Sequence, residues 1–315
     1  DELTNGIHPH YDFINKKLSE KYEFAIGEGI FGLSKSEVNA LKLTEVEKKL
    51  IKPYYNSAEN VNRYAIGTTD LRIIYTPSAF KDSHSMDSYP HLKAHLDRFK
   101  DVISSDNKPY GLHRARVESF FIGEKIVALR KCAGKPVFAY ANGENYMSAT
   151  FYVIKTNRVN MKYLTGLLNS KLIEFWLKNK GKMQGINYQL DKEPLQQIPI
   201  AVPSDNIQEL IAKLVDVIIL LNTMEGRVST LVQNSYISSE FEKLIDGCIF
   251  EIYLPDEMTG ISIISVLQNC IKQKSFININ NIWELYMKID STGIIEYLNS
   301  LSLSNSKALR TIILS

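Results

Sequence analysis

A helix followed by a loop near the middle of the chain, residues 164–200, most constrains the fold. Its apolar residues recur at helical spacing, so one face of the helix should pack inward: Leu164, Leu167, Leu168, Leu172, Ile173, Phe175 and Trp176. Glycines end the helix and prolines stop regular structure further on, at Gly181, Gly185, Pro194 and Pro199. Between them, residues 187–190 favour a short strand or turn. The sequence thus predicts a rigid helix that presents a basic, amide-rich loop with an aromatic residue.

Positive charge gathers in two windows of a nearly neutral chain. The net charge is +2, yet residues 111–135 hold six Lys or Arg against two Glu. Residues 155–192 hold eight Lys or Arg against two acidic residues, so the rest of the chain is net acidic. A basic face on such a molecule fits a groove that binds phosphate. Lysines that merely solvate helices give the same count, so charge alone leaves both interpretations open.

Two short motifs suggest other chemistries, but their context argues against both. Residues 27–32 match the glycine pattern of dinucleotide-binding loops, yet the next helix starts at a capping box of Ser34 and Glu37. His8 and His10 stand in a Pro-containing turn without nearby carboxylates, which favours exposed imidazoles over a metal site. We expect no cofactor-binding site and no metal site. A nucleotide-dependent enzyme built on residues 27–32 is the remaining enzymatic alternative.

Residues 110–160 carry the pattern of a β-sheet. Short runs rich in β-branched and aromatic residues are separated by single glycines, at residues 120–122, 125–129, 136–140 and 149–154. Arginines stand at the ends of these runs and amides in the turns, where their paired donors and acceptors suit guanine and adenine edges. Arg114 and Arg116 are therefore candidates for base reading. The other interpretation pairs them with Glu118 or Glu124 in surface ion pairs.

The order of these segments resembles the target recognition domain of restriction-modification enzymes. The resemblance covers most of residues 1–205 and rests on an LLNSKL-type helix at residues 167–172, the aromatic pair after it, the basic glycine-containing loop and the closing Ile-Pro-Ile at 198–200. A Lys-Pro-aromatic step at residues 52–54 and a PhexxGxKI pattern at 120–126 continue it. The chain is similar to the TaqI-like C-terminal specificity region of Type IIG enzymes and more distantly to Type I specificity subunits.

This resemblance implies sequence-specific recognition of double-stranded DNA. The implied parent protein is a site-specific adenine-N6 DNA methyltransferase, with or without endonuclease activity, that uses S-adenosylmethionine. Its catalytic and cofactor residues would lie on a methyltransferase domain outside these 315 residues. The first residue is Asp and not Met, which fits a piece of a longer protein.

Candidate DNA contacts follow from side-chain chemistry. Lysines would fix the duplex by its phosphates, arginines and amides would read base edges, and a tyrosine would stack or wedge. The predicted contacts are Arg114, Arg116, Arg130, Lys131, Asn145, Tyr146, Lys180, Lys182, Gln184, Asn187 and Tyr188.

Strongly apolar helices follow the predicted recognition segment. Beyond Pro203, one broad apolar face runs from Ile207 to Leu221, and apolar residues resume from Val228 to Ile249. Such helices resemble the spacers of specificity subunits, although a helix buried in the same domain is a competing interpretation. We expect an α+β fold with a mixed-sheet target recognition domain over residues 1–204, long spacer helices over 205–253 and a small helical unit over 254–315.

No arrangement of residues suggests catalysis. We find no nucleophile paired with a base, no Asn-Pro-Pro-Tyr or Asp-Pro-Pro-Tyr motif for a flipped base, and no convincing nuclease motif. The three cysteines are odd in number and widely spaced, and no apolar run is long enough for a membrane span. We therefore expect a cytoplasmic, non-catalytic DNA-recognition region. A protein interaction scaffold without a nucleic-acid role is the alternative.

Overall fold

The computed structural model describes residues 2–271 and 278–315 and divides into two compact units. Unit 1 comprises residues 1–60, 68–127 and 141–154, and unit 2 comprises residues 61–67, 128–140 and 155–315. These units differ from the predicted divisions at residues 204 and 253. The long helices share a core with the helix that begins the predicted recognition segment, so both fall in unit 2.

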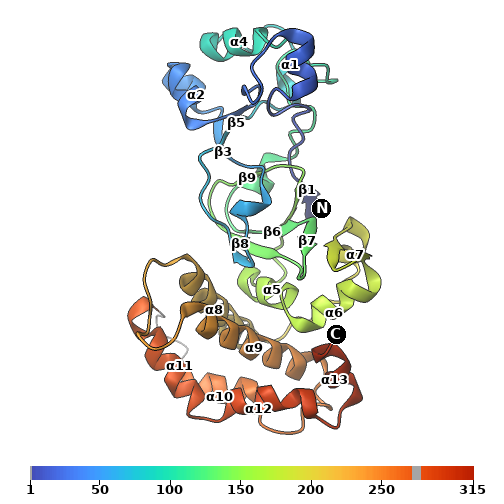
Figure 1. The fold of residues 1–315 in the computed structure, drawn as a ribbon, viewed down its shortest axis with the longest axis vertical. Helices are drawn as coiled ribbons and strands as arrows, with labels where there is room; N and C mark the ends of the chain where they lie inside the picture. Colours follow the sequence, from blue (N-terminus) through green and yellow to red (C-terminus); the bar gives the residue numbers. More distant parts are fainter. Residues whose placement is uncertain (1, 272–277) are drawn as a thin grey trace. The chain divides into compact units, whose positions relative to one another are not determined.

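Unit 1 is built on a four-stranded mixed sheet (Figure 1). Its strand order is β2 (Gly32–Leu33), β5 (Arg72–Ile74), β3 (Ile51–Tyr55) and β9 (Tyr146–Met147). Strand β3 runs antiparallel to β5 and parallel to β9. Separately, β1 (Leu3–Asn5) pairs antiparallel with β10 (Phe151–Ile154). The helices of this unit are α1 (Lys16–Tyr22), α2 (Lys35–Ala40), α3 (Glu45–Lys48) and α4 (Pro90–Asp97).

Unit 2 combines small sheets with helices. A three-stranded antiparallel sheet has the order β11 (Lys182–Gln184), β12 (Asn187–Gln189) and β7 (Lys131–Ala133). Strand β4 (Tyr64–Ala65) pairs in parallel with β8 (Phe138–Ala141), while β6 (Lys125–Leu129) crosses from unit 1 to unit 2 along the chain. The helices are α5 (Met161–Leu168), α6 (Lys171–Lys180), α7 (Lys192–Gln196), α8 (Asp205–Thr223), α9 (Asn234–Tyr253), α10 (Ile263–Cys270), α11 (Ile282–Asp290), α12 (Ile294–Ser300) and α13 (Lys307–Ile313).

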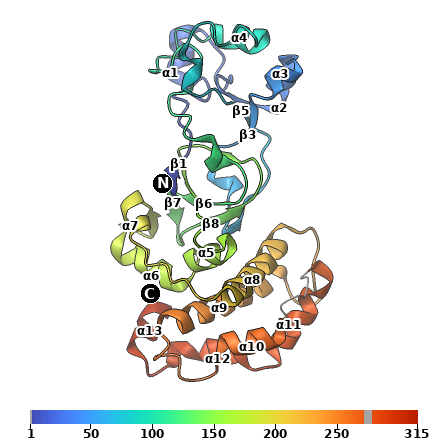
Figure 2. The same cartoon turned by 180° about the vertical axis from the view of Figure 1, so that it is seen from behind.

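The pair of long helices α8 and α9 forms the core of unit 2. Their apolar residues repeat at helical spacing, and in α8 Ile211, Leu214 and Ile218 are fully buried. Figures 1 and 2 show α5 on one side of this pair and the C-terminal helices α10 and α12 on the other. The α+β fold with a helical C-terminal region is thereby confirmed.

Close approach of α5 to the long helices requires a glycine. A Cβ on Gly166 would lie only 3.0 Å from Ile211 Cγ2 and 3.2 Å from Val215 Cγ2, both on α8, and 3.4 Å from Ile245 Cγ2 on α9. A larger side chain therefore requires these neighbouring side chains to move.

The predicted single helix across residues 164–176 is wrong, because the chain forms α5 and α6 with a break between them. Ser170 Oγ accepts a hydrogen bond from Ile173 N and so caps a new helix. Asn169 is held by side-chain bonds to another segment and does not continue α5. The predicted and observed helices differ because Ser170, an N-cap residue, lies inside the apolar pattern.

Two smaller predictions are also wrong. The run at residues 120–122 does not form a strand, because its first two residues lie in a 3-10 helix that spans Glu118–Phe121. Pro194 lies inside α7, where its missing N–H costs nothing because the first turn of a helix needs no such donor. The predicted capping box of Ser34 and Glu37 is confirmed, with Ser34 N donating to Glu37 Oε2 over 2.7 Å.

Replacing Gly166 with Val should destabilise the protein by about 1–3 kcal/mol, because the added methyl groups collide with Ile211 and Val215. Helix propensity alone predicts that this substitution slightly increases the stability, so a measured loss of stability identifies the packing effect. Urea unfolding measures it. Ser239→Val, at an exposed position of α9, is the control and should shift stability by less than about 0.5 kcal/mol. Equal effects of the two substitutions would contradict the packing argument.

Candidate nucleic-acid interface

One face of the three-stranded sheet in unit 2 is polar and exposed. Lys182 lies opposite Gln189, and Gln184 lies opposite Asn187, so these four side chains share a face. On the other side of β12, Lys131 lies opposite Gln189 and continues the same face. We call this set the polar face: Lys131, Lys182, Gln184, Asn187 and Gln189. All but the partly exposed Gln189 are exposed.

The opposite face of the same sheet is apolar and packs inward. Tyr188 is 3% exposed and lies opposite Cys132, which is 2% exposed. Burial, together with the negative charge of Glu174 on α6, raises the pKa of the Tyr188 phenol. Alternation with a period of two therefore attaches the sheet to unit 2 through one face and leaves the other to solvent.

A two-residue turn closes the hairpin of β11 and β12. Gly185 has φ of 63°, a left-handed value that favours glycine, whereas Ile186 is not among the residues with positive φ. Glycine first and an ordinary residue second is the pattern of a type II′ hairpin turn. The carbonyl oxygen of Ile186 accepts a hydrogen bond from Gly134 N over 3.3 Å, so the tip is held by the chain just after β7.

Positive charge surrounds this hairpin. Lys182 Nζ lies 2.9 Å from Asp191 Oδ2, yet the Lys182 side chain is 71% exposed and keeps most of its surface open to a ligand. Lys180, at the end of α6, sits over the Trp176 ring with Nζ 6.0 Å from the centroid. Lys131 and Lys135 are exposed on or next to β7. The amide groups of the polar face thus have exposed lysine side chains around them.

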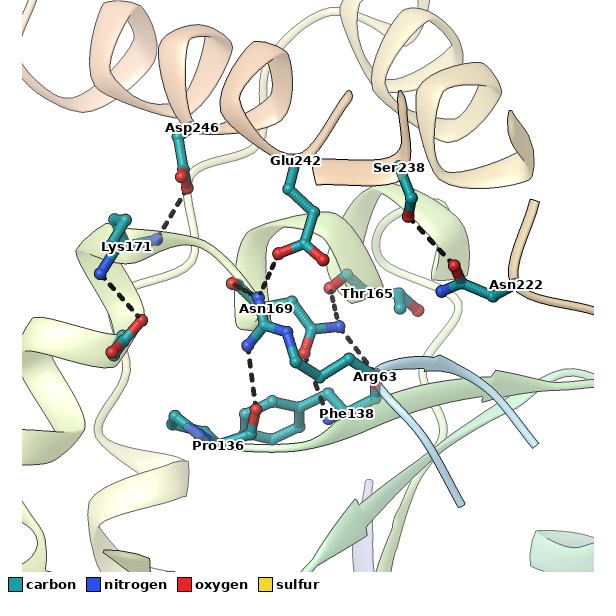
Figure 3. Close-up of polar contacts among 11 residues, drawn as sticks. Arg63, Pro136, Phe138, Thr165, Asn169, Lys171, Asn222, Ser238, Glu242 and Asp246 are labelled. Atoms are coloured by element: carbon teal, nitrogen blue, oxygen red, sulfur yellow. Dashed lines mark hydrogen bonds and ion pairs between the residues drawn. The ribbon is translucent and has the colours of Figure 1, made fainter. Parts of the chain in front are cut away.

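Arg63 holds the segment between β7 and β8 to the helices (Figure 3). Its guanidinium donates to Pro136 O over 3.0 Å and to Asn169 O over 2.7 Å. It also forms an ion pair with Glu242 of α9, at 2.9 Å from Oε2. One side chain therefore joins a strand connection, the turn between α5 and α6, and a long helix.

Asn169 adds two bonds to β8. Its Nδ2 donates to Phe138 O over 2.7 Å, and its Oδ1 accepts from Phe138 N over 3.2 Å (Figure 3). This amide therefore pairs with the strand as a neighbouring strand would. Since β8 follows β7 by a short connection, these bonds help to set the position of the polar face.

Asp246 of α9 binds the start of α6. Its Oδ1 accepts a hydrogen bond from Lys171 N over 2.7 Å, and Lys171 is the first residue of α6. Burial raises the pKa of Asp246 to about 7, against lowering contributions from the Lys171 N–H and the Arg63 charge. The carboxyl group is thus close to its protonation midpoint near neutral pH.

Comparison with known proteins identifies the segment that carries this sheet. The family of TaqI-like C-terminal specificity domains matches residues 52–200, just under half of the chain. This segment is similar to the TaqI-like specificity domains. All members of the polar face lie within it. The resemblance to a target recognition region of restriction-modification enzymes is therefore confirmed.

Solved structures extend the likeness beyond the specificity domain. The chain is similar to a Type IIL restriction-modification enzyme, MmeI, solved in complex with DNA, with a TM-score of 0.58 and 13% identity over 92% of this chain and 36% of that one. At that identity the likeness shows the fold alone. A Type IIG restriction endonuclease, BpuSI, matches with a TM-score of 0.42 and 15% identity over 81% of this chain and 30% of that one. The chain thus spans about a third of each enzyme. No curated protein matches the sequence.

The structure brings together part of the predicted contact set. Lys131, Lys182, Gln184 and Asn187 share the polar face, with Arg130 just before β7 and Lys180 just before β11. The prediction that Tyr188 stacks on a base needs correction, because this ring faces the interior. Gln189 and Ile186 were missed, although the period-two alternation after Lys182 and the Gly-Ile turn were visible in the sequence.

The remaining predicted contacts belong to unit 1. Arg114 is exposed, whereas Arg116 is half-buried and its Nε donates to Gly6 O over 3.1 Å. Asn145 and Tyr146 are 7% and 0% exposed. Asn145 Oδ1 accepts from the buried Lys125 Nζ, and Tyr146 donates to Glu118 over 2.6 Å. The predicted base contacts of Asn145 and Tyr146 are therefore corrected to internal structural bonds.

Other kinds of site are not found in the described residues. Within residues 2–271 and 278–315, no group of three or more His, Cys, Asp or Glu side chains is placed to hold a metal ion. None of the helices in the same part of the chain is long and apolar enough to cross a membrane. In the glycine-rich segment at residues 27–32, Gly29 N donates to Glu37 Oε1 over 2.8 Å, so this backbone donor already has an acceptor within the protein.

Asp246→Asn should make stability less sensitive to pH. The raised pKa of Asp246 means that folding takes up a proton between about pH 4 and pH 7, so the wild type loses stability relative to the variant as pH rises through that range. An amide oxygen still accepts from Lys171 N. Urea unfolding at about pH 5 and pH 8 measures the difference. Glu242→Gln, which removes the ion pair with Arg63, is the control and should lower stability at both values. Parallel pH profiles of wild type and Asp246→Asn would refute the assignment.

Proposed function

We propose that this chain is a sequence-specific recognition region for double-stranded DNA in a restriction-modification methyltransferase. The observation that supports it best is the polar face, where two lysines and three amides lie on one side of an anchored sheet within the specificity domain. Amides bind adenine through N6 and N7, and lysines bind phosphate. The DNA complex of MmeI, a protein of similar fold, supports the same proposal.

The mechanism that we propose is binding by a β-ribbon. A two-stranded ribbon fits the major groove, where each base pair presents a distinct set of donors and acceptors. Gln184 and Asn187, next to the tip of the ribbon, would reach base edges, while Lys131 and Lys182 would fix the ribbon through phosphates. Exposed Arg114 of unit 1 remains a proposed contact.

Catalysis is proposed to belong to the rest of the parent protein. We infer that this region itself is not an enzyme and that the parent is an adenine-N6 methyltransferase that holds S-adenosylmethionine on a separate domain, with or without a nuclease. The absence of a methyltransferase motif from the sequence supports this view. The proposed partners are duplex DNA and that methyltransferase domain, and the proposed compartment is the cytoplasm.

Replacing Lys131 with Gln should weaken binding to all duplexes alike, because a phosphate contact carries no sequence information. The plot of log affinity against log salt should become shallower by about one, the effect of one lost counterion. Fluorescence anisotropy at several salt concentrations measures both quantities. Lys307→Gln on the exposed surface of α13 is the matched control and should change neither. A protein interaction scaffold without a nucleic-acid role would show no salt-dependent duplex binding at all.

Asn187→Ala should instead relax discrimination at one base pair, by about 1–3 kcal/mol, and leave the salt slope unchanged. Selection of bound duplexes from a random pool, followed by sequencing, measures preference at each position. Gln196→Ala removes an amide from α7, outside the polar face, and should keep the wild-type preference. A uniform loss of affinity across all sequences would assign Asn187 to phosphate binding.

A further inference from the structure

An isoleucine at the tip of the hairpin has no structural role inside the protein. Ile186 is 75% exposed and is the second residue of the two-residue turn between β11 and β12. Within the sheet, the larger apolar side chains of Met183, Tyr188 and Cys132 point to the inner face. The tip therefore offers an unused apolar contact next to the polar face.

The backbone under Ile186 is fixed on both sides. Strand β11 holds it through the paired residues Gln184 and Asn187, and Gly134 N donates to its carbonyl oxygen over 3.3 Å. A β-branched side chain has few χ1 conformations, so a fixed backbone also fixes the direction of its methyl groups. Such a side chain loses little conformational entropy when a ligand covers it.

The chemistry around Ile186 indicates what would cover it. The amides of Gln184 and Asn187 flank it along the chain, and exposed Lys182 lies further down the same ribbon. Amides suit adenine in the major groove, and the thymine paired with that adenine presents its C5 methyl group in the same groove. An aliphatic side chain between two amides is complementary to such a methyl group at the A·T pairs that the amides read.

We propose that Ile186 is a specificity-determining residue that contacts the C5 methyl group of a thymine in the target site. This inference rests on the proposed function and deepens it, since it assigns to the hairpin a preference for A·T base pairs. The exposure of an apolar side chain does not by itself support this assignment. Leu231 and Leu303 are 88% and 84% exposed but lie in segments outside the polar face. The tip position, the anchored backbone and the flanking amides set Ile186 apart.

The experiment replaces thymine by uracil, which differs only by the missing methyl group. A preferred duplex is first selected from a random pool with the wild-type chain, and each thymine is then replaced singly. Wild type should bind about three- to fivefold more weakly at one substituted position, the effect of one buried methyl group. Ile186→Ala should bind the thymine duplex more weakly by a similar factor and show no uracil penalty at that position.

Two further variants make the result specific. Leu231→Ala removes an exposed leucine from a loop before α9 and should keep the wild-type uracil penalty. Ile186→Val retains branched methyl groups and should keep a smaller penalty. Thermal unfolding of each variant checks the fold, and the uracil series with wild type alone tests the inference if Ile186→Ala does not fold.

The outcomes separate this inference from the function on which it rests. A wild-type chain that binds no duplex, or binds every sequence equally, would overturn the proposed function and the inference together. Sequence-specific binding that tolerates uracil at every position would overturn the inference alone. An undiminished uracil penalty with Ile186→Ala would assign the methyl contact to another residue and would also overturn it.

Discussion

The bonds around Arg63 and Asn169 are the constraint on which the position of the polar face depends. Arg63 reaches the connection after β7, the turn between α5 and α6, and helix α9 at once. Asn169 completes the backbone pairing of β8. These partners are distant in sequence, so their meeting depends on the packed helices. A charged group bound by two carbonyls and a carboxylate is costly to strip of any partner, which gives the arrangement a defined geometry.

The helices α8 and α9 thus act through polar contacts as well as through apolar packing. Gly166 lets α5 approach α8 closely, and Asp246 binds the start of α6. Helix α6 in turn carries Glu174, whose charge acts on the buried Tyr188 of the sheet. The long helices therefore belong to the framework that supports the polar face, and the interpretation as a separate spacer does not describe their contacts within unit 2.

Much of the fold was predictable from periodicity, and the chemistry of the site only in part. The apolar face of α8 and the glycine after α6 gave clear local signals. The break between α5 and α6 was not predicted, because Asn169 and Ser170 lie inside an otherwise continuous apolar pattern. The side chain of Asn169 binds a segment that is distant in sequence. Tyr146 and Asn145 were misassigned for the same reason, since only tertiary contact with Glu118 and Lys125 shows that they are internal.

Lys182, Gln184, Asn187 and Lys131 were recognisable as exposed and basic or amide-bearing, because charged and amide side chains seldom face a core. Only the strand register shows that these four side chains lie on one face of the sheet. A shift by one residue would have turned Tyr188 outward and Asn187 inward. Burial of the apolar Tyr188 and Cys132 side chains excludes that shift in register. The packing of the inner face therefore determines which side chains are exposed to solvent.

The alternation of the hairpin has an evolutionary consequence. Outward positions contribute nothing to the interior, so selection can exchange the residues at 182, 184, 187 and 189 while Met183, Tyr188 and the glycine at 185 stay unchanged. Under the proposed function, a few codon changes at these outward positions would change the DNA target and leave the buried residues as they are. The residues that would determine the DNA target and the residues that maintain the fold thus alternate along the same two strands.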